Sequence, residues 1–243
     1  MRNEQAHIAD SRARLRWHLA LGTLLVLATV LSGMLKLGHT YLNGRPGYNF
    51  LPFNLFLAWI PFVAAVMAYL ARKHRLTFFL VMPVCTLVWL AFFPNAAYLL
   101  TDFQHLAVDS SRAPLWYDVI LLIWYAWTGL LLGISSLYLM QAIVTELFSR
   151  WFGWLFAIAA TVLSSLGIYL GRFLRWNSWD LLYDPIPIAR DMADIVRNPL
   201  SNLPTYVFTI LFTLLFLFIY VTIHVLGHLM RSPRGERITE QDA

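Results

Sequence analysis

Long apolar runs alternate with short polar segments along the whole chain. Each run is about 20 residues long, which is enough for an α-helix to cross a hydrocarbon core of about 30 Å. The pattern therefore predicts an all-α fold, a polytopic transmembrane helix bundle of six spans. The expected spans are Trp17–Leu37, Leu51–Ala71, Leu76–Phe93, Trp116–Met140, Trp151–Leu174 and Tyr206–Met230.

The polar segments divide the chain into one membrane domain and two short ends. We predict a cytoplasmic N-terminal segment at residues 1–16, a single six-span membrane domain at 17–230 and a cytoplasmic tail at 231–243. The first apolar run is longer than the apolar core of a signal peptide, roughly 7–15 residues, so it is expected to remain as a span. Residues 38–48 (GHTYLNGRPGY) are rich in turn formers and predict a connector.

The third span continues into a polar stretch at residues 92–106 (FFPNAAYLLTDFQHL). Pro94 is expected to kink or restart the helix at Phe93, because the residue before a proline is pushed out of the helical region. A straight helix from Leu76 to His105 would be about 45 Å long, so the stretch should bend along the interface or re-enter a protein-lined cavity. Four of its polar side chains share one helical face, within an arc of roughly 80°: Asn95, Tyr98, Asp102 and His105.

Two further patterns concern helix placement. Residues 187–197 carry an apolar stripe opposite a charged one, which predicts a short helix lying in the membrane interface between the fifth and sixth spans. The fourth and fifth spans carry the glycine pairs Gly129/Gly133 and Gly167/Gly171, a spacing that allows helix backbones to approach closely.

Composition supports the membrane class. Of the 243 residues, 59% are hydrophobic and only 13% are charged, about half the charged fraction of about 25% in soluble domains. The net charge of +5 comes from residues near the span ends, so the expected partner is the lipid bilayer and not nucleic acid. The lone Cys85 lies in an apolar run and has no partner for an internal disulfide. No motif identifies a cofactor or a metal site.

The orientation follows from the basic residues. With the N-terminus inside, eleven of the 18 Lys and Arg residues fall on the inner side and seven on the outer side. Because cytoplasmic loops carry the excess of Lys and Arg, both termini are predicted to be cytoplasmic. The polar stretch after Pro94 then faces the outside.

Other chemistry-bearing residues are expected on that outer side. Arg172 and Arg175 lie three apart on the last turns of the predicted fifth span, where they could present two guanidinium forks to a phosphate or carboxylate. The candidate catalytic residues are Asp102, His105 and Asp118. The candidate substrate-binding residues are Asn54, Asn95, Tyr98, Arg172, Arg175 and Asp180.

Several strings of the chain resemble a known family. They are residues 54–61 (NLFLAWIP), 93–102 (FPNAAYLLTD), 115–118 (LWYD), 126–129 (AWTG) and 167–180 (GIYLGRFLRWNSWD). Over roughly residues 50–225 the chain resembles the domain of unknown function family 1361, predicted bacterial multi-span membrane proteins. The resemblance implies a multi-pass protein of the bacterial inner membrane, and it brings no established activity, substrate or cofactor.

Three functions compete at this point. In an enzyme acting on a lipid-borne or phosphate-containing substrate, the two arginines would hold an anion, Asp102 or His105 would move protons, and Asp118 or Asp180 would orient them. In a non-catalytic scaffold or assembly factor, the polar cap would bind a partner. A carrier of small solutes or ions is disfavoured, because the inner halves of the third to fifth spans hold almost no ionisable groups.

A purely structural role stands beside these functions. The same charged groups could neutralise one another in an ion network that ties helix ends together. A metal site built on Asp102 and His105 is disfavoured, because only one His lies nearby and zinc favours several nitrogen or sulfur ligands. The substrate, the oligomeric state and whether the protein is an enzyme stay open.

Overall fold

The computed structural model describes residues 2–44, 46–72, 75–107 and 113–229. This part of the chain contains six helices that are long and apolar enough to cross a membrane. The predicted all-α class and six spans are confirmed. In chain order the elements are α1 Arg2–Asn43, α2 Phe50–Ala71, α3 Arg75–Tyr98, the 3₁₀ helix η1 Leu99–Ala107, α4 Leu115–Leu147, α5 Arg150–Phe173, α6 Asp180–Tyr183, α7 Pro185–Arg197 and α8 Leu203–Leu229.

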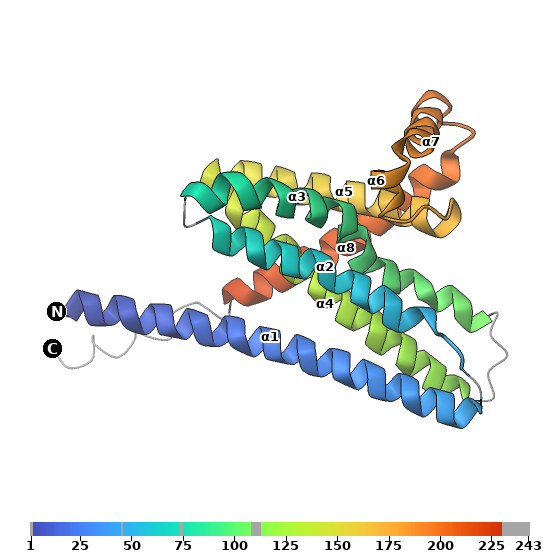
Figure 1. Cartoon of the computed structure of the whole chain (residues 1–243), viewed down its shortest axis with the longest axis horizontal. Coiled ribbons are helices and arrows are strands. Elements are labelled where there is room, and N and C mark those ends of the chain that lie inside the picture. Colours follow the sequence, from blue (N-terminus) through green and yellow to red (C-terminus); the bar gives the residue numbers. More distant parts are fainter. Residues whose placement is uncertain (1, 45, 73–74, 108–112, 230–243) are drawn as a thin grey trace.

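The long helices run back and forth along one axis. Figure 1 shows the start of α1, the α2–α3 connection, the α4–α5 connection and the end of α8 at one end of the bundle. The start of α2, η1, the start of α4, α6 and α7 lie toward the other end, which we call the η1 end. Helix α2 packs along α3 and α4, α5 packs along α8, α4 and α3, and α1 packs on α4. The predicted tail 231–243 and the basic residues Arg45, Lys73 and Arg112 lie outside the described residues.

The first helix is longer than the predicted first span, and its apolar part, the candidate span, is Ala20–Asn43. Helix α1 runs unbroken from Arg2 to Asn43, so it includes most of the predicted N-terminal segment and half of the predicted connector. One face of its C-terminal half is polar and buried against the bundle, with Ser32, Lys36, His39 and Asn43 all less than one-tenth exposed. The helix continues through Gly38 because these side chains are covered by the neighbouring helices and not by water.

Of the kink or restart expected at Phe93, the restart is wrong. Helix α3 passes through Pro94 and ends at Tyr98, and only then does the chain tighten into η1. The proline ring fits because α5 presents Gly167 to it: a Cβ built on Gly167 would lie 2.7 Å from Pro94 Cγ. The side-chain amide of Asn95 also donates to the carbonyl oxygen of Phe92, at 3.1 Å. Missing side-chain volume on one helix thus makes room for a proline in the next.

The bend of the polar stretch is present, one turn later than expected. In Figure 1, η1 leaves the end of α3 at an angle and runs toward the end of the bundle where α4 begins. It packs against α4, and the Asp102 side chain within it is fully buried. One face of η1 therefore lies against the protein.

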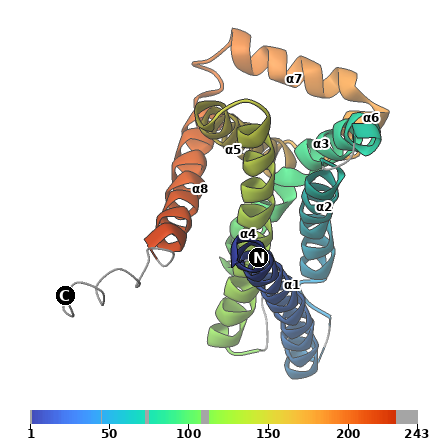
Figure 2. The ribbon, with the colours of Figure 1, turned by 90° about the vertical axis from the view of Figure 1, so that its left-hand side faces the viewer.

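The amphipathic helix between the last two spans is also present, as α7. Figures 1 and 2 together show α7 running across the direction of the long helices instead of along it. Its apolar residues Ile188 and Ile195 are buried, whereas its charged residues Arg190 and Asp194 are not. An amphipathic helix with this crosswise direction is typical of one that lies at a membrane surface.

Candidate functional site

Arg172, in the last turn of α5, is the centre of a polar cluster. Its Nε and Nη2 atoms donate to Thr101 Oγ1 at 2.8 and 2.6 Å, and Nη2 also donates to Asp102 Oδ1. Its Nη1 atom lies 3.3 Å from His105 Nε2. With the Gln104 amide turned so that its oxygen faces the guanidinium, that oxygen accepts from Nη1 at 2.9 Å. The guanidinium is therefore engaged by protein groups on every nitrogen.

The helix type explains how η1 supplies so many of these partners. A 3₁₀ helix has three residues per turn, so Asp102 and His105 lie one above the other on the same face. Both turn toward Arg172 and not toward each other. A guanidinium only donates, so His105 Nε2 must accept, and a neutral His105 ring then carries its proton on Nδ1.

Two residues of neighbouring helices complete the cluster. Asn54 of α2 donates its Nδ2 to Asp102 Oδ2 at 3.3 Å, and the Arg172 guanidinium carbon lies 4.0 Å from the centre of the Tyr98 ring in α3. The Asp102 and Arg172 side chains are only 1% and 8% exposed. We call these residues, Asn54, Tyr98, Thr101, Asp102, Gln104, His105 and Arg172, the Arg172 cluster. It joins α2, α3, η1 and α5 through one buried ion pair.

A cavity of about 250 Å³ adjoins this cluster. Asn54 and Tyr98 line the cavity and also belong to the Arg172 cluster, so these two side chains separate the cavity from the ion pair. Asn95, expected to share their face, lines the cavity as well and donates to Ser178 Oγ at 2.8 Å. The remaining walls come from apolar residues of α2, α3 and α5, from the segment 176–181 and from Ile188 of α7.

Residues 53–219 match the family model described as Protein of unknown function (DUF1361). The chain belongs to this family. The match contains the whole Arg172 cluster and the whole cavity, while α1 lies outside it. No curated protein and no solved structure matches the chain.

Four of the predicted site residues of this DUF1361 protein are not in the cluster, and of these Asn95 lines the cavity. Asp118, in the first turn of α4, pairs with His39 of α1 instead, with 3.0 Å between His39 Nε2 and Asp118 Oδ1. Arg175 lies beyond the end of α5, with a left-handed backbone (φ 63°) and an exposed side chain, so it does not share a helix with Arg172. Asp180 accepts from the backbone N and the Nδ2 of Asn177, at 2.7 and 3.1 Å. Because Arg175 lies beyond the helix that carries Arg172, the expected pair of guanidinium forks is absent.

An aromatic path connects the His39–Asp118 pair to the Arg172 cluster. The His39 and Tyr48 rings lie 5.1 Å apart, the Tyr48 and Phe50 rings 6.1 Å, and the Phe50 and His105 rings 4.5 Å, each between centroids. His39 was not among the predicted site residues because residues 38–48 were predicted to form a connector. Thr101 and Gln104 were not among them because a 3.6-residue period does not bring them onto the face of Asp102.

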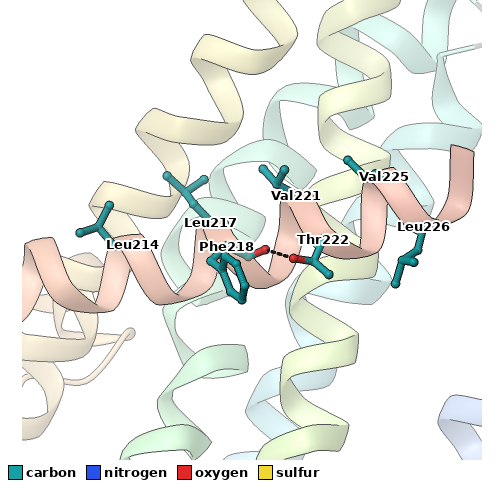
Figure 3. A pocket seen from close by; sticks show the side chains of 7 residues that line it. All are labelled: Leu214, Leu217, Phe218, Val221, Thr222, Val225 and Leu226. Atoms are coloured by element: carbon teal, nitrogen blue, oxygen red, sulfur yellow. Dashed lines mark hydrogen bonds between the residues drawn. The ribbon is translucent and has the colours of Figure 1, made fainter. Parts of the chain in front are cut away.

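Among the described residues, no group of three or more His, Cys, Asp or Glu side chains is arranged to hold a metal ion. A larger hollow, of about 530 Å³, lies on α8 (Figure 3). Its seven lining side chains all come from that helix, and the Thr222 hydroxyl in it already donates to the Phe218 carbonyl oxygen at 2.7 Å. This hollow belongs to the apolar outer surface of a span and offers no site chemistry.

Proposed function

We propose that this DUF1361 protein binds a lipid-borne substrate at the extracytoplasmic end of the bundle, with the polar part of the substrate in the cavity beside the Arg172 cluster. One observation carries the proposal: the cavity combines polar side chains at the η1 end with apolar side chains from three spans. A membrane lipid has the same division into a polar head and an apolar chain. The extracytoplasmic placement rests on the asymmetry of Lys and Arg.

The role of the ion pair in this proposal is to position other residues. The nitrogens of Arg172 are engaged by protein groups, so it is not available as an anion clamp without losing those contacts. What the pair does hold is Asn54, through Asp102, and Tyr98, through the contact of the guanidinium with its ring. Fixed side chains on the wall of a cavity bind with less loss of conformational entropy.

The experiment is to identify lipids that remain with the purified protein. We expect a lipid species retained after extraction in mild detergent, and its amount should fall in Asn54→Leu, which removes a polar wall group. Asn49→Leu is the matched control, because Asn49 is an exposed asparagine just before α2. Thermal unfolding of each variant separates lost binding from lost folding. Absence of any retained lipid from the wild-type protein would contradict the proposal and leave the scaffold interpretation.

A catalytic function is the second candidate, and the observation that favours it concerns His105. Its ring contacts Arg172 through Nε2 and is only partly buried, so it can pass on the Nδ1 proton only if Nε2 takes up another proton and releases Arg172. His105→Gln keeps an acceptor near the position of Nε2 but cannot act as an acid or base at neutral pH. If the protein is an enzyme, cells expressing His105→Gln accumulate an unconverted lipid that wild-type cells do not, as measured by mass spectrometry of total lipid. Identical lipid profiles, with retained binding in both proteins, would reject catalysis by His105.

A further inference from the structure

The head-group chemistry that the cavity can accept follows from its polar wall. The wall consists of amide, hydroxyl and indole side chains: Asn54, Asn95, Asn177, Tyr98, Ser178 and Trp176. None of the described residues that line the cavity is charged. A phosphate or carboxylate in this space would meet no cation among the described lining residues, and an uncompensated charge near the membrane is costly.

Three neighbouring charged side chains are committed elsewhere, and a fourth, Arg175, is exposed and does not line the cavity. Asp191 of α7 accepts from Trp176 Nε1 at 2.7 Å, which fixes the indole over the cavity. Asp180 accepts from Asn177, and Arg172 is bound by η1. Amides and hydroxyls both donate and accept hydrogen bonds, so this wall suits a head that does the same without a net charge. The flat apolar faces of indole rings suit the CH faces of a sugar ring.

The apolar wall determines where a chain would go. Leu57, Leu90, Ala91 and Leu163 belong to the spans α2, α3 and α5. Leu90 and Leu163 are 41% and 51% exposed, so this wall continues onto the outer surface of α3 and α5. The cavity volume of about 250 Å³ is below the range of about 300–1,000 Å³ that holds a drug-sized ligand. Only a head and the first chain carbons fit, and the rest of the chain lies against the two helices in the bilayer.

We infer that the cavity takes a lipid with an uncharged, hydroxyl-rich head, such as a glycosyl lipid, whose hydrocarbon chain leaves between α3 and α5. This inference rests on the proposed function and specifies its substrate class. It replaces the phosphate clamp that the spacing of Arg172 and Arg175 predicted.

The test uses three photoactivatable probes with the same alkyl chain: an alkyl glucoside, an alkyl phosphate and an alkanol, each with a diazirine close to the head. The full-length protein is reconstituted in phosphatidylcholine nanodiscs, irradiated with each probe and digested, and the labelled peptides are measured by mass spectrometry. We expect the glucoside to label residues 90–98, 163–171 and 176–181 at least about fivefold more than either other probe. A factor of about five corresponds to one net hydrogen bond.

Variants separate the head from the chain. Asn95→Leu should reduce labelling by the glucoside to the level of the alkanol, and Ser178→Ala should reduce it in the same direction if Asn95→Leu fails to fold. Ala91→Trp should reduce labelling by all three probes, because it fills the apolar wall. Leu80→Trp is its matched control on α3, 64% exposed and three turns farther toward the opposite end of the bundle, and should change nothing.

The outcomes distinguish this inference from the proposed function. Labelling by the phosphate equal to or above that by the glucoside would overturn the uncharged head and leave the lipid-borne substrate in place. Cavity labelling that Ala91→Trp leaves unchanged would overturn the chain path. A retained native lipid together with a cavity that no probe labels would overturn the choice of site, and failure of both experiments would remove the proposed function as well.

Discussion

Arg172 shows how one buried guanidinium can organise the end of a membrane bundle. It contacts Thr101, Asp102 and His105 of η1 and the ring of Tyr98, while Asp102 in turn holds Asn54 of α2. Arg is suited to this role because its donors form a planar fork that is always charged. The same residue types support a structural and a functional interpretation, and the contacts show only that the pair holds Asn54 and Tyr98.

The first prediction concerns this ion pair. Asp102→Asn leaves the buried guanidinium without its carboxylate, and we expect a loss of about 3–5 kcal/mol in the free energy of unfolding, since breaking a buried pair leaves an uncompensated charge. Thermal or denaturant unfolding in detergent measures it. The double variant Asp102→Leu/Arg172→Met should lose less unfolding free energy than the single variants Asp102→Leu and Arg172→Met lose in sum.

A surface pair on the same chain is the control. Arg72 Nε lies 2.8 Å from Glu146 Oε2, and the Glu146 side chain is 62% exposed. Glu146→Gln should cost no more than about 1 kcal/mol, because water and salt screen an exposed pair. Equal losses of unfolding free energy in Asp102→Asn and Glu146→Gln would show that the buried pair of Asp102 and Arg172 does not stabilise the fold.

The second prediction is a pH dependence at the junction of α7 and α8. Asn198 and Asn202 donate to the two oxygens of Asp194 at 2.7 and 3.2 Å, and these hydrogen bonds hold the pKa of Asp194 below its usual value. A lowered pKa in the folded state means that this stabilisation is complete above the unfolded pKa of about 3.9 and is lost as the pH falls through the folded value. Pepsin cleavage at residues 198–203 should therefore increase as the pH falls below about 3.9. Asp194→Asn should remove this increase, and identical pH profiles in both proteins would contradict the assignment.

At the level of elements, the contact of α3 with α5 depends on a residue with no side chain. Pro94 would ordinarily break α3, because it removes one hydrogen bond and its ring clashes with the preceding turn. Helix α5 accommodates the ring at Gly167, and the helix continues to Tyr98. One turn later, a Cβ on Gly171 would lie 3.4 Å from the Tyr98 ring, within ordinary contact. The predicted close approach of α5 is therefore real, and its partner is the proline-containing end of α3.

The third prediction tests that contact. Gly167→Ala places a methyl group 2.7 Å from Pro94 Cγ, in a ring that cannot move aside, so we expect a loss of about 1–3 kcal/mol from overpacking. Gly227→Ala is the matched control on α8, because a Cβ there meets nothing within 4 Å. The control should be neutral or slightly stabilising, since Ala favours a helix more than Gly does. Unfolding temperatures of the two variants decide, and equal values would refute the contact.

Helix α1 is attached to the bundle by further polar contacts that were not predicted from the sequence. Trp59 of α2 donates to Thr29 Oγ1 at 3.0 Å, and Tyr117 of α4 donates to the Leu35 carbonyl oxygen at 2.9 Å. Together with the pair of His39 and Asp118, these bonds attach α1 to α2 and α4. In lipid, where apolar burial gives little driving force between helices, such bonds help to hold a span in place.

For the whole molecule, the packing of the helices determines which loops lie at the same end of the bundle. It does not determine which end faces the cytoplasm. The α4–α5 turn and the α7–α8 loop lie at opposite ends of the bundle (Figure 1). The fourth prediction assigns them: the α4–α5 turn is cytoplasmic and the α7–α8 loop is outside, because the basic residues favour a cytoplasmic N-terminus.

Two exposed serines make the test symmetrical. In a Cys85→Ala background, Ser201→Cys should react with a membrane-impermeant maleimide in intact cells, whereas Ser149→Cys should react only after the membrane is disrupted. Cys85 is buried in the bundle and is replaced only to leave a single thiol. Labelling in the reverse order would place the cavity on the cytoplasmic side and would contradict the orientation in the proposed function.

The hydrophobic pattern was enough to predict the six spans, because a helix in lipid must satisfy its backbone internally and about 20 apolar residues are needed to cross. The crosswise helix α7 was also predictable, since its two faces differ along a 3.6-residue period. Residue types near the span ends indicated that polar groups gather at one end. Each of these predictions depends only on residues that are close to one another in the sequence.

The partners of those polar groups were decided only by the tertiary structure. Asp118 faces His39 and not Asp102, and Arg175 leaves the helix that carries Arg172. Sequence spacing could not reveal this, because a helix end, a change to a 3₁₀ helix or a glycine on a neighbouring helix each redirects a side chain without changing its position in the chain. The cavity likewise exists only where three spans and the segment 176–181 meet. Composition and periodicity determine that this protein lies in a membrane, whereas packing between distant segments determines which of its polar residues form a site.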